Sequence, residues 1–366
     1  MTAKKIFIVV GTRPNFIKVT QFRKVAAKYP GLEISIIHTG QHYDTRMADV
    51  FFEQFNLVPD HFLNITPGSP NTQTAQIMLK LEELFAQAGK PDLLLVVGDV
   101  NSTLAAALAA HKMDIPLGHI ESGLRSFDRT MPEEINRILT DELAGYFFVT
   151  EQSGYDNLLK ESKKEEHIYF VGNTMIDTLV AFREQIAANP VLQELGIKEN
   201  EFALMTMHRP ATVDNKEGLE KLLQVIEKIT ETWWLVFPIH PRTLKNLEQF
   251  DLLNRFSSNQ RIIKVAPMDY FAFQRLITTC KFVITDSGGI QEETTFVGKP
   301  CITLRPNTER PSTCELGTNT LAPFEIAALE TLFHQIKEGT YKKGTIPPLW
   351  DGKATERILS ALMQIL

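Results

Sequence analysis

Residues 285–293 read Thr-Asp-Ser-Gly-Gly-Ile-Gln-Glu-Glu, and they follow directly on the apolar run Phe282-Val283-Ile284. The run predicts a buried strand, and the residues after the glycines continue in a helical pattern. A strand that turns through Ser-Gly-Gly into a helix directs free backbone N–H groups and the positive end of the helix dipole at one point. The stretch therefore predicts a phosphate or diphosphate site on Ser287, Gly288 and Gly289. An ordinary glycine-containing turn is the alternative.

The same alternation of short β-rich runs with amphipathic stretches extends along the whole chain. The expected strands are 6–10, 33–38, 93–97, 117–120, 146–149, 168–171, 202–207, 235–239, 261–265, 282–285 and 300–304. The expected helices include 72–88, 102–112, 216–230 and 270–279. Near-continuous apolar strands that alternate with helices are typical of parallel sheets covered on both faces. The sequence therefore predicts an α/β protein with two Rossmann-like domains.

The two halves of this pattern have similar lengths, which indicates where the domains divide. We expect an N-terminal domain at 1–172, a hinge near Gly172-Asn173, and a C-terminal domain at 173–352 that binds the nucleotide. The segment 353–366 is helical, and we expect it to pack back on the first domain.

Composition excludes several classes of protein. Among 366 residues, 44 acidic side chains exceed 38 basic ones, and the net charge of −6 disfavours a nucleic-acid partner. No stretch approaches the ~18–20 apolar residues of a membrane span. The three cysteines, Cys280, Cys301 and Cys314, lack CxxC spacing and indicate reduced thiols. We therefore predict a cytoplasmic protein without a membrane partner.

Polar residues follow six of the expected strands. They are Gly11-Thr-Arg-Pro14, Gly98-Asp99, Glu121, His208-Arg209, His240 and Ser287. Ligands of open parallel sheets bind beyond the carboxyl ends of the strands. The pattern therefore predicts one site in a cleft that both domains face.

In the first half, four residues are candidates for the site. Arg13 suits a diphosphate, unless it is only a surface arginine. Asp99 suits a base or a sugar hydroxyl, with a helix N-cap as the alternative. Glu121 closes a buried strand, so its carboxylate must be used or paired, and Arg125 is the expected partner. Glu133 opens a helix beside Glu134, where one carboxylate complements the helix dipole.

In the second half, His208 is expected to stabilise a leaving diphosphate, whereas His240 is interpreted as structural. Phe273 lies in an aromatic cluster and is a candidate for stacking on a base, with core packing as the alternative. Glu293 lies too far along its helix to meet phosphates, so it is expected to accept hydrogen bonds from ribose hydroxyls.

Several cofactor motifs are missing from the sequence. It contains no G-x-G-x-x-G, no phosphate loop, no H-E-x-x-H and no Asp-x-Asp. We therefore predict a nucleotide site without a metal and without a cofactor.

Taken together, these segments resemble the non-hydrolysing UDP-N-acetylglucosamine 2-epimerases. The matching pieces span nearly the whole chain in family order: Gly11-Thr-Arg-Pro with Lys18, Gly40-Gln-His42, Gly98-Asp99, His119-Ile-Glu-Ser-Gly-Leu-Arg125, Pro132-Glu-Glu-Ile-Asn-Arg137, Gly172-Asn-Thr174, His208-Arg209, Asp286-Ser-Gly-Gly-Ile-Gln-Glu-Glu293 and Thr308-Glu-Arg-Pro311. Any one piece is weak evidence, but the set is specific.

The resemblance implies a GT-B-like fold, a homodimer and the interconversion of UDP-GlcNAc and UDP-ManNAc, which supplies activated ManNAc for cell-surface polysaccharides. It implies anti elimination of UDP to 2-acetamidoglucal, followed by re-addition with C2 inverted. By resemblance, the catalytic positions are Lys18, Asp99, Glu121, Glu133 and His208. Likewise, the contacts to UDP are Arg13, Phe273, Ser287, Gly288, Gly289, Glu293 and Arg310. Which carboxylate is the C2 base stays open.

The chain also departs from the family's commonest pattern. Asn15 stands where Glu is usual, and His208-Arg-Pro-Ala replaces His-Arg-Arg-Glu. Gln41 and Gln73 are present, but Asp44 and Thr72 replace residues of the activator site that some bacterial members carry, which leaves such a site open. The alternatives are a 2-epimerase of a UDP-2,3-diacetamido sugar acid, a hydrolysing epimerase, a GT-B glycosyltransferase and a non-catalytic sugar-nucleotide sensor.

Overall fold

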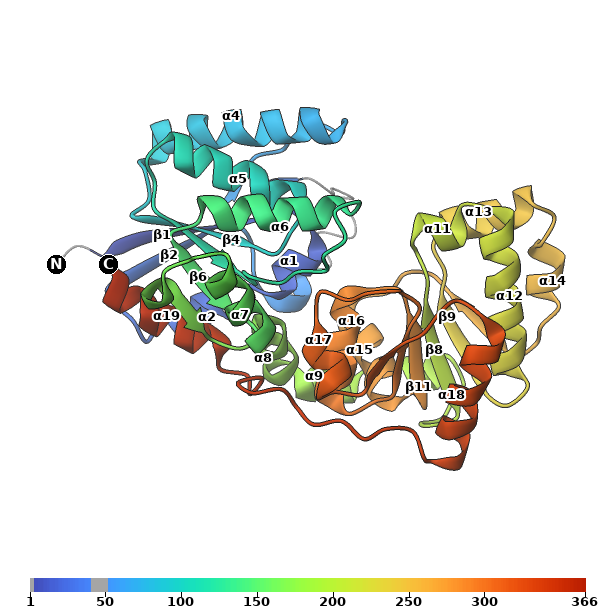
Figure 1. Ribbon diagram of the computed structural model, residues 1–366. Helices are drawn as coiled ribbons and strands as arrows, with labels where there is room; N and C mark the ends of the chain where they lie inside the picture. Colours follow the sequence, from blue (N-terminus) through green and yellow to red (C-terminus); the bar gives the residue numbers. More distant parts are fainter. Residues whose placement is uncertain (1–2, 41–51) are drawn as a thin grey trace. The chain divides into compact units, whose positions relative to one another are not determined.

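The computed structural model describes residues 3–40 and 52–366, which form two compact units (Figure 1). Unit 1 combines Met1–Ala181 with Pro348–Leu366, and unit 2 is Phe182–Pro347. Each unit has its own parallel sheet and its own hydrophobic core. The α/β class that the sequence predicts, with two parallel sheets, is confirmed.

The sheet of unit 1 has the strand order β3-β2-β1-β4-β5-β6-β7, and its pairs are all parallel. Its described strands are β1 (Lys4–Val10), β2 (Leu32–His38), β3 (His61–Phe62), β4 (Leu93–Val97), β5 (Leu117–Ile120), β6 (Tyr146–Val149) and β7 (Ile168–Phe170). Its described helices are α1 (Arg13–Ile17), α2 (Phe22–Ala26), α4 (Pro70–Ala88), α5 (Asn101–Lys112), α6 (Pro132–Leu143), α7 (Gln152–Lys160), the 3₁₀ turn η1 (Glu165–His167), α8 (Thr174–Ala181) and α19 (Ala354–Ile365).

Helices cover both faces of this sheet, as its apolar strands require. Helices α4, α5 and α6 lie on one face, whereas α2, α8 and α19 lie on the other (Figure 1). Side chains alternate along β1, so that Phe7 and Val9 join the α4–α5 core while Ile6 and Ile8 are buried on the opposite face. Alanines on α5, among them Ala105 and Ala106, are fully buried and let that helix approach the sheet.

The C-terminal segment is fastened to unit 1 by buried polar contacts. The indole Nε1 of Trp350 donates to the carbonyl of Thr150 at 2.9 Å. The Asp177 carboxylate on α8 accepts hydrogen bonds from the backbone N–H groups of Ala354 (3.0 Å) and Thr355 (2.6 Å). Asp177 therefore satisfies two of the donors that the start of α19 leaves without helical partners.

The sheet of unit 2 has the strand order β10-β9-β8-β11-β12-β13, again with parallel pairs. Its strands are β8 (Phe202–Thr206), β9 (Trp234–Pro238), β10 (Ile262–Val265), β11 (Phe282–Thr285), β12 (Cys301–Thr303) and β13 (Asn319–Leu321). Its helices are α9 (Arg183–Ala188), α10 (Val191–Glu194), α11 (Pro210–Val213), α12 (Lys216–Thr230), α13 (Pro241–Gln249), α14 (Leu253–Ser257), α15 (Tyr270–Thr279), α16 (Gly288–Val297), α17 (Pro311–Glu315) and α18 (Ile326–Glu338).

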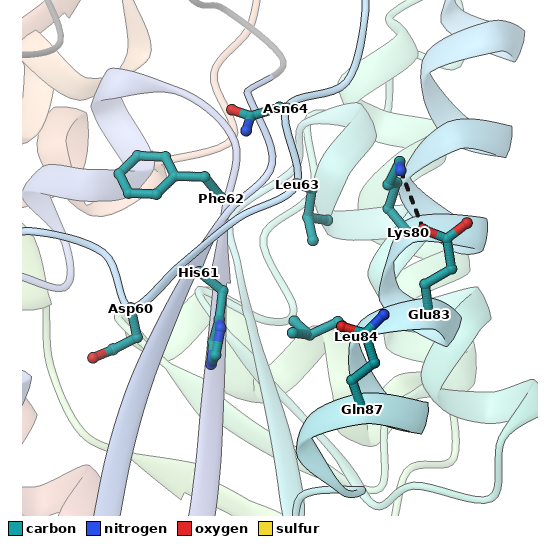
Figure 2. Close-up of a pocket in the computed structure, with 9 residues that line it drawn as sticks. All are labelled: Asp60, His61, Phe62, Leu63, Asn64, Lys80, Glu83, Leu84 and Gln87. Carbon is teal, nitrogen blue, oxygen red and sulfur yellow. Dashed lines mark hydrogen bonds and ion pairs between the residues drawn. The ribbon is translucent and has the colours of Figure 1, made fainter.

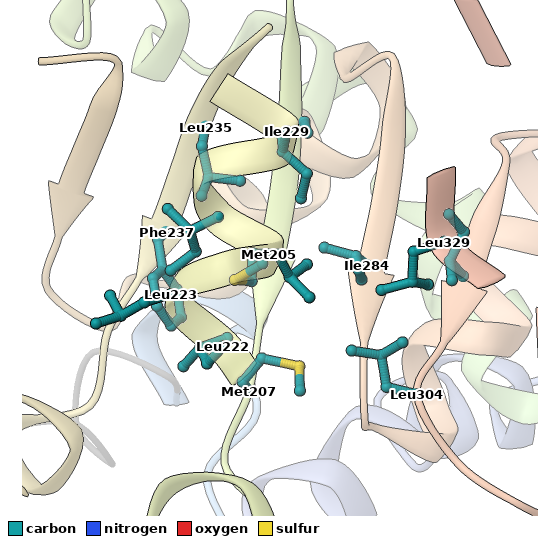
Figure 3. Packing of buried hydrophobic residues seen from close by; sticks show 14 of the residues in the cluster. Met205, Met207, Leu222, Leu223, Ile229, Leu235, Phe237, Ile284, Leu304 and Leu329 are labelled. Atoms are coloured by element: carbon teal, nitrogen blue, oxygen red, sulfur yellow. The ribbon is translucent and has the colours of Figure 1, made fainter. Parts of the chain in front are cut away.

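Two hydrophobic layers sandwich this second sheet. Met205 and Met207 face α12 and α18, where Leu223 and Leu329 pack against them in one cluster (Figure 3). The alternate side chains of β8, including Leu204, join α10, α15 and α16 in a separate cluster on the other face. The start of α16 therefore rests on a buried apolar layer at the carboxyl end of β11.

Most elements coincide with the predicted ones, and two strands were missed. Strands 93–97 and 282–285 and helices 216–230 and 270–279 have the predicted bounds. The missed strands, β3 and β13, are two and three residues long. Each is the edge strand of its sheet and is too short to show a periodic apolar pattern. In the part of the chain that the structure describes, no helix has both the length and the apolar character needed to cross a bilayer.

We predict that Asp177→Asn weakens the attachment of α19. The amide keeps one acceptor oxygen for two buried backbone donors, which should lower the free energy of unfolding by about 1–3 kcal/mol. Urea denaturation of the purified protein measures this change. Glu356→Gln, at a solvent-accessible ion pair between α19 and Lys28, is the control, with an expected effect below about 0.5 kcal/mol. Equal effects of the two variants would contradict the proposed role of Asp177.

Candidate functional site

Each sheet reverses its strand order once. In unit 1, β2 and β3 lie on one side of β1, whereas β4 to β7 lie on its other side, so the order reverses between β1 and β4. In unit 2 the same reversal separates β8 from β11. A ligand crevice forms at such a reversal, beyond the carboxyl ends of the strands. The predicted site residues cluster at or beside these ends.

In unit 1, the centre of the cluster is a buried ion pair between Lys18 and Glu121. The ammonium Nζ of Lys18, directly after α1, lies 2.6 Å from the carboxylate Oε2 of Glu121, directly after β5. Their side chains are 8% and 2% exposed. The prediction that Arg125 pairs with Glu121 was wrong, because Arg125 instead pairs with Asp141 (2.7 Å) and Glu161 (2.6 Å).

Glu121 also has an unusual backbone. Its φ of 68° lies in the left-handed region, which costs a residue other than glycine of order 1 kcal/mol. Residues held in this way concentrate at functional sites. The strand end therefore presents the carboxylate in an orientation that an extended backbone would not give.

Gly98 brings the turn after β4 against the same pair. With φ of 67°, a Cβ at this position would lie 3.0 Å from Nδ2 of Asn15, 3.4 Å from Nζ of Lys18 and 3.6 Å from Oε2 of Glu121. Asn15 in turn donates to the carbonyl of Val97 at 3.0 Å. Asn15, where the family pattern has Glu, thus fastens α1 to the end of β4.

Asp99 lies beside this turn and pairs with Arg137. The Asp99 Oδ2 is 3.0 Å from Nε of Arg137 and 2.9 Å from its Nη2. Asn136 donates to the backbone carbonyl of Asp99 at 2.8 Å. The N-cap of α5 is Val100, without a side-chain cap, so the alternative role of Asp99 as an N-cap does not hold.

Glu133 and Glu134 open α6 but lie in different environments. Glu134 is buried and accepts hydrogen bonds from the backbone N–H groups of Ser126 (2.9 Å) and Phe127 (2.9 Å). Glu133 is exposed, and no described residue forms a hydrogen bond or ion pair with its carboxylate. The structure therefore gives Glu134 a structural role and leaves Glu133 accessible to a ligand.

Arg13 is the first residue of α1, and Pro14 follows it in the first turn. The Arg13 side chain is half-buried. Arg13 is thus in the same short helix as Asn15, about one turn before Lys18.

In unit 2, His208 follows β8 and pairs with Asp286, which follows β11. The ring Nδ1 of His208 lies 2.6 Å from Oδ1 of Asp286, and the imidazole is 61% exposed. The other oxygen of Asp286 accepts from the backbone N–H groups of His208 (2.9 Å) and Arg209 (2.8 Å). Burial alone would raise the pKa of Asp286, yet His208 and these two donors hold it below its usual value of 3.8.

The Thr285–Glu293 stretch forms the end of β11 and the start of α16. Ser287 is the N-cap residue, but its side chain does not cap the helix, and Gly288 and Gly289 are half-buried. A Cβ on Gly288 would lie 2.5 Å from Oε1 of Glu309 and 2.8 Å from Nη1 of Arg310. The glycine is therefore required, because the backbone passes directly over these two side chains.

Arg310 belongs to a buried network of charges beneath that turn. Its Nε lies 2.8 Å from Oε2 of Glu292, and its Nη1 contacts Glu309. Glu309 also accepts from Arg305 at 2.9 Å. Arg310 thus supports the helix start while its guanidinium adds positive charge next to it.

Glu293 and Phe273 lie on the facing helices α16 and α15. Burial raises the pKa of Glu293 to about 7, although hydrogen bonds to Gln274 and Tyr270 oppose this shift. Phe273 is half-buried and packs against the apolar cluster beneath α15. The ring is therefore partly a core residue, as the alternative interpretation holds, and partly accessible.

The predicted residues fall into two groups. The first contains Asp99, Glu121 and Lys18 around Gly98, and the second contains the α16 turn with Arg310 in contact with Gly288. Among the activator positions, Thr72 and Gln73 lie in the first turn of α4, whereas Gln41 and Asp44 lie outside the described residues.

A hollow of about 460 Å³ lies elsewhere in unit 1, between β3 and α4 (Figure 2). It is lined by Asp60, His61, Phe62, Leu63, Asn64, Lys80, Glu83, Leu84 and Gln87. Lys80 and Glu83 neutralise each other across 3.1 Å at its rim. None of the predicted site residues is part of this lining, so the hollow is separate from the strand-end cluster.

Three residues that hold the candidate side chains in place were not predicted from the sequence: Asn15, Arg137 and Asp286. Asp286 directly follows an apolar strand, and Arg137 lies in a helix that starts with two carboxylates, so the sequence carries a signal for each of these two.

Comparison with known proteins identifies a consistent group of relatives. The family model described as UDP-N-acetylglucosamine 2-epimerase matches residues 24–363. The UDP-N-acetylglucosamine 2-epimerase of Methanocaldococcus jannaschii is 39% identical over 368 residues, 98% of each chain. The UDP-2,3-diacetamido-2,3-dideoxy-D-glucuronate 2-epimerase of Pseudomonas aeruginosa is 37% identical over 322 residues, 87% of this chain and 88% of that one. A crystal structure of the M. jannaschii enzyme with UDP-GlcNAc and UDP superposes with a TM-score of 0.89 and 38% identity, covering 98% and 99% of the two chains.

We predict a pH-dependent contribution of Asp286 to stability. Asp286→Ala removes the acceptor of two backbone N–H groups and of the His208 ring. This change should lower the free energy of unfolding by about 1–3 kcal/mol at pH 7. Since the folded-state pKa is lowered, this contribution is fully present above the unfolded-state value of about 3.8 and is lost as the pH falls through the folded-state value.

Urea denaturation of wild type and variant at pH 7, 5 and 3.5 tests this. The difference in the free energy of unfolding between wild type and Asp286→Ala should be constant from pH 7 to 5 and smaller at pH 3.5. The exposed Glu248→Ala is the control, with no comparable difference. A cost of Asp286→Ala that grows on acidification would contradict the assignment.

Proposed function

Because the chain belongs to the UDP-N-acetylglucosamine 2-epimerase family, we propose that it interconverts UDP-GlcNAc and UDP-ManNAc without hydrolysing them. The observation that carries the proposal is the buried Lys18–Glu121 pair at a strand end, with Glu121 in a left-handed backbone conformation. A buried carboxylate and ammonium in contact are groups suited to moving a proton. The M. jannaschii relative, crystallised with UDP-GlcNAc and UDP, supports the choice of substrate.

The reaction must first weaken the bond between the anomeric carbon and UDP. The C2–H of a pyranose has no adjacent carbonyl, so it is a very weak acid. Departure of the diphosphate builds positive charge at C1 and acidifies C2–H. Removing this proton and completing the C1–O cleavage gives 2-acetamidoglucal and UDP. UDP then adds back to C1, and a proton adds to C2 on the opposite face.

In this proposal, the second unit supplies most of the stabilisation for the leaving diphosphate. The backbone N–H groups of Gly288 and Gly289 and the hydroxyl of Ser287, which does not cap the helix, suit its oxygens. His208, held through Nδ1 by Asp286, offers Nε2 to the same group. Arg13 of α1 adds a guanidinium. Glu293 is assigned to the ribose and Phe273 to the uracil ring.

The first unit supplies the groups that exchange protons with the sugar. We assign Asp99, Glu121 and Glu133 to this set, because C2 inversion requires proton transfer on both ring faces. Lys18 holds the Glu121 carboxylate in position through their ion pair at 2.6 Å. Arg137 orients Asp99.

A related substrate is the second candidate. The P. aeruginosa relative acts on a UDP-2,3-diacetamido-2,3-dideoxy-D-glucuronate and is nearly as similar to this chain as the M. jannaschii enzyme is. Two relatives named UDP-N-acetylglucosamine 2-epimerase are 39% and 42% identical to this chain, against 37% for the P. aeruginosa enzyme, which favours UDP-GlcNAc. Parallel assays with both sugars distinguish them. The homodimer and the role in polysaccharide supply stay predictions.

We predict that proton NMR of UDP-GlcNAc with the enzyme in D₂O shows UDP-ManNAc forming with deuterium at C2. The nucleotide should remain attached to the sugar at equilibrium. A hydrolysing enzyme would instead accumulate free ManNAc and UDP. A glycosyltransferase or a sensor would leave C2–H in place, and epimerisation with C2–H retained would refute the elimination mechanism.

We further predict that Glu121→Gln and Asp99→Asn each lower kcat by about 100-fold or more, because a proton-transfer group is lost. Affinity for UDP should change little, since neither Glu121 nor Asp99 is among the residues that we assign to UDP. Glu142→Gln, at an exposed ion pair on α6, is the control and should retain full activity. Normal turnover in both site variants would remove these carboxylates from the mechanism.

A further inference from the structure

Beneath the Gly98 turn lies a completely buried histidine that the proposed mechanism does not use. His119 is on β5, two residues before Glu121, and neither it nor its partner Asp141 on α6 has any exposed surface. The ring Nδ1 lies 2.6 Å from Oδ1 of Asp141. The ring Nε2 lies 2.8 Å from the backbone carbonyl of Gly98.

These partners determine where the ring hydrogens are. A carbonyl oxygen only accepts hydrogen bonds, so Nε2 facing Gly98 must carry a hydrogen. An ionised carboxylate also only accepts, so Nδ1 facing Asp141 must carry one too. A neutral imidazole has only one N–H, so one of these two acceptors would face the lone pair of the other ring nitrogen.

Asp141 is held in its ionised form by further donors. Its Oδ2 accepts from the backbone N–H of Gly123 at 3.0 Å and lies 2.7 Å from Nη1 of Arg125. Burial alone would raise the pKa of Asp141, but His119 and Arg125 hold it below its usual value. Arg125 also forms a bidentate pair with Glu161, so its charge is shared between two carboxylates.

The same contacts join the two turns that carry the proposed acid–base groups. Through Gly98, His119 holds the backbone immediately before Asp99. Through Asp141 and Gly123, it holds the backbone two residues after Glu121. The carbonyl of Ile120 also accepts from the N–H of Gly98 at 3.0 Å, which closes the link between the two turns.

We infer that His119 is a permanent imidazolium and a positioning residue, which fixes the Gly98–Asp99 turn relative to Glu121. The positioning role rests on the proposed epimerase function, whereas the charge of the ring does not. A fixed cation here also binds the Gly98 carbonyl more strongly than a neutral donor would. Small displacements of catalytic groups reduce rates by about 100-fold.

The charge is tested by ¹⁵N NMR of the full-length protein with labelled histidine, without substrate. Both ring nitrogens of His119 should show the N–H type signal across pH 6–9. In Asp141→Asn the compensating charge is gone, and one nitrogen should change to the lone-pair type. His119→Asn identifies the signals by their absence. A lone-pair nitrogen in the wild type would overturn the assignment.

The positioning role is tested by the kinetics of His119→Asn and Asp141→Asn with UDP-GlcNAc. In each variant kcat should fall by about 100-fold, while KM and the affinity for UDP stay within about threefold. Asp177→Asn is the matched control, because it also weakens a buried carboxylate in unit 1 but contacts neither turn. It should lose stability and keep its kcat.

Loss of kcat in the control to the same extent would show that general destabilisation explains the effect, and would overturn the role. So would normal kcat in both variants of the network. An inactive wild type would overturn the proposed function together with this role, whereas the NMR result would still decide the charge of the ring.

Discussion

Carboxylates buried at the ends of parallel strands are the constraint on which the rest of this structure depends. A charge in such a place is stable only when an opposite charge or several N–H donors face it. Lys18 reaches Glu121 across 103 residues of sequence, and His208 reaches Asp286 across 78. His208 and Asp286 follow β8 and β11, the neighbouring strands at which the order of the second sheet reverses, whereas Lys18 and Glu121 follow β1 and β5, which flank β4. The groups that compensate these charges therefore bring candidate site residues from distant parts of the sequence together.

This constraint connects stability with chemistry. In the proposed mechanism, the ion pair of Lys18 and Glu121 is already formed before a ligand binds, so these two groups need little reorganisation during the reaction. In unit 2, Asp286 orients the His208 ring while leaving most of its surface exposed. The uncapped start of α16 completes the arrangement, because a helix end with its own side-chain cap would compete with a phosphate.

The fold was largely predictable because its strands are continuous apolar runs. Leu93–Val97 and Phe282–Thr285 are buried along their whole length, and such runs have no other stable environment in a soluble protein. Edge strands such as His61–Phe62 escaped prediction, since two residues carry no periodic signal. The expected GT-B-like class, the epimerase family and the isomerase activity of that family agree with the solved relatives.

Candidate site residues could be named from the sequence, and they stay predictions, whereas their contacts could not be foreseen. Glu121 was expected to need a partner, and the nearest arginine in the sequence was the wrong choice. Lys18 supplies the charge because β1 and β5 both flank β4 in the sheet, and the sequence states no such neighbours. Arg137 and His119 were overlooked for the same reason, since their roles depend on pairing between distant segments.

The discontinuous make-up of unit 1 has a consequence for biosynthesis. Trp350 and helix α19, whose N-terminus is hydrogen-bonded to Asp177, belong to unit 1. A nascent chain therefore cannot complete this unit until residues 348–366 have been synthesised. Unit 2 is contiguous in sequence and is available to fold while the ribosome is still translating. A nonsense mutation near the 3′ end of the gene would therefore destabilise unit 1, which contains Glu121, although most of unit 1 is synthesised before unit 2.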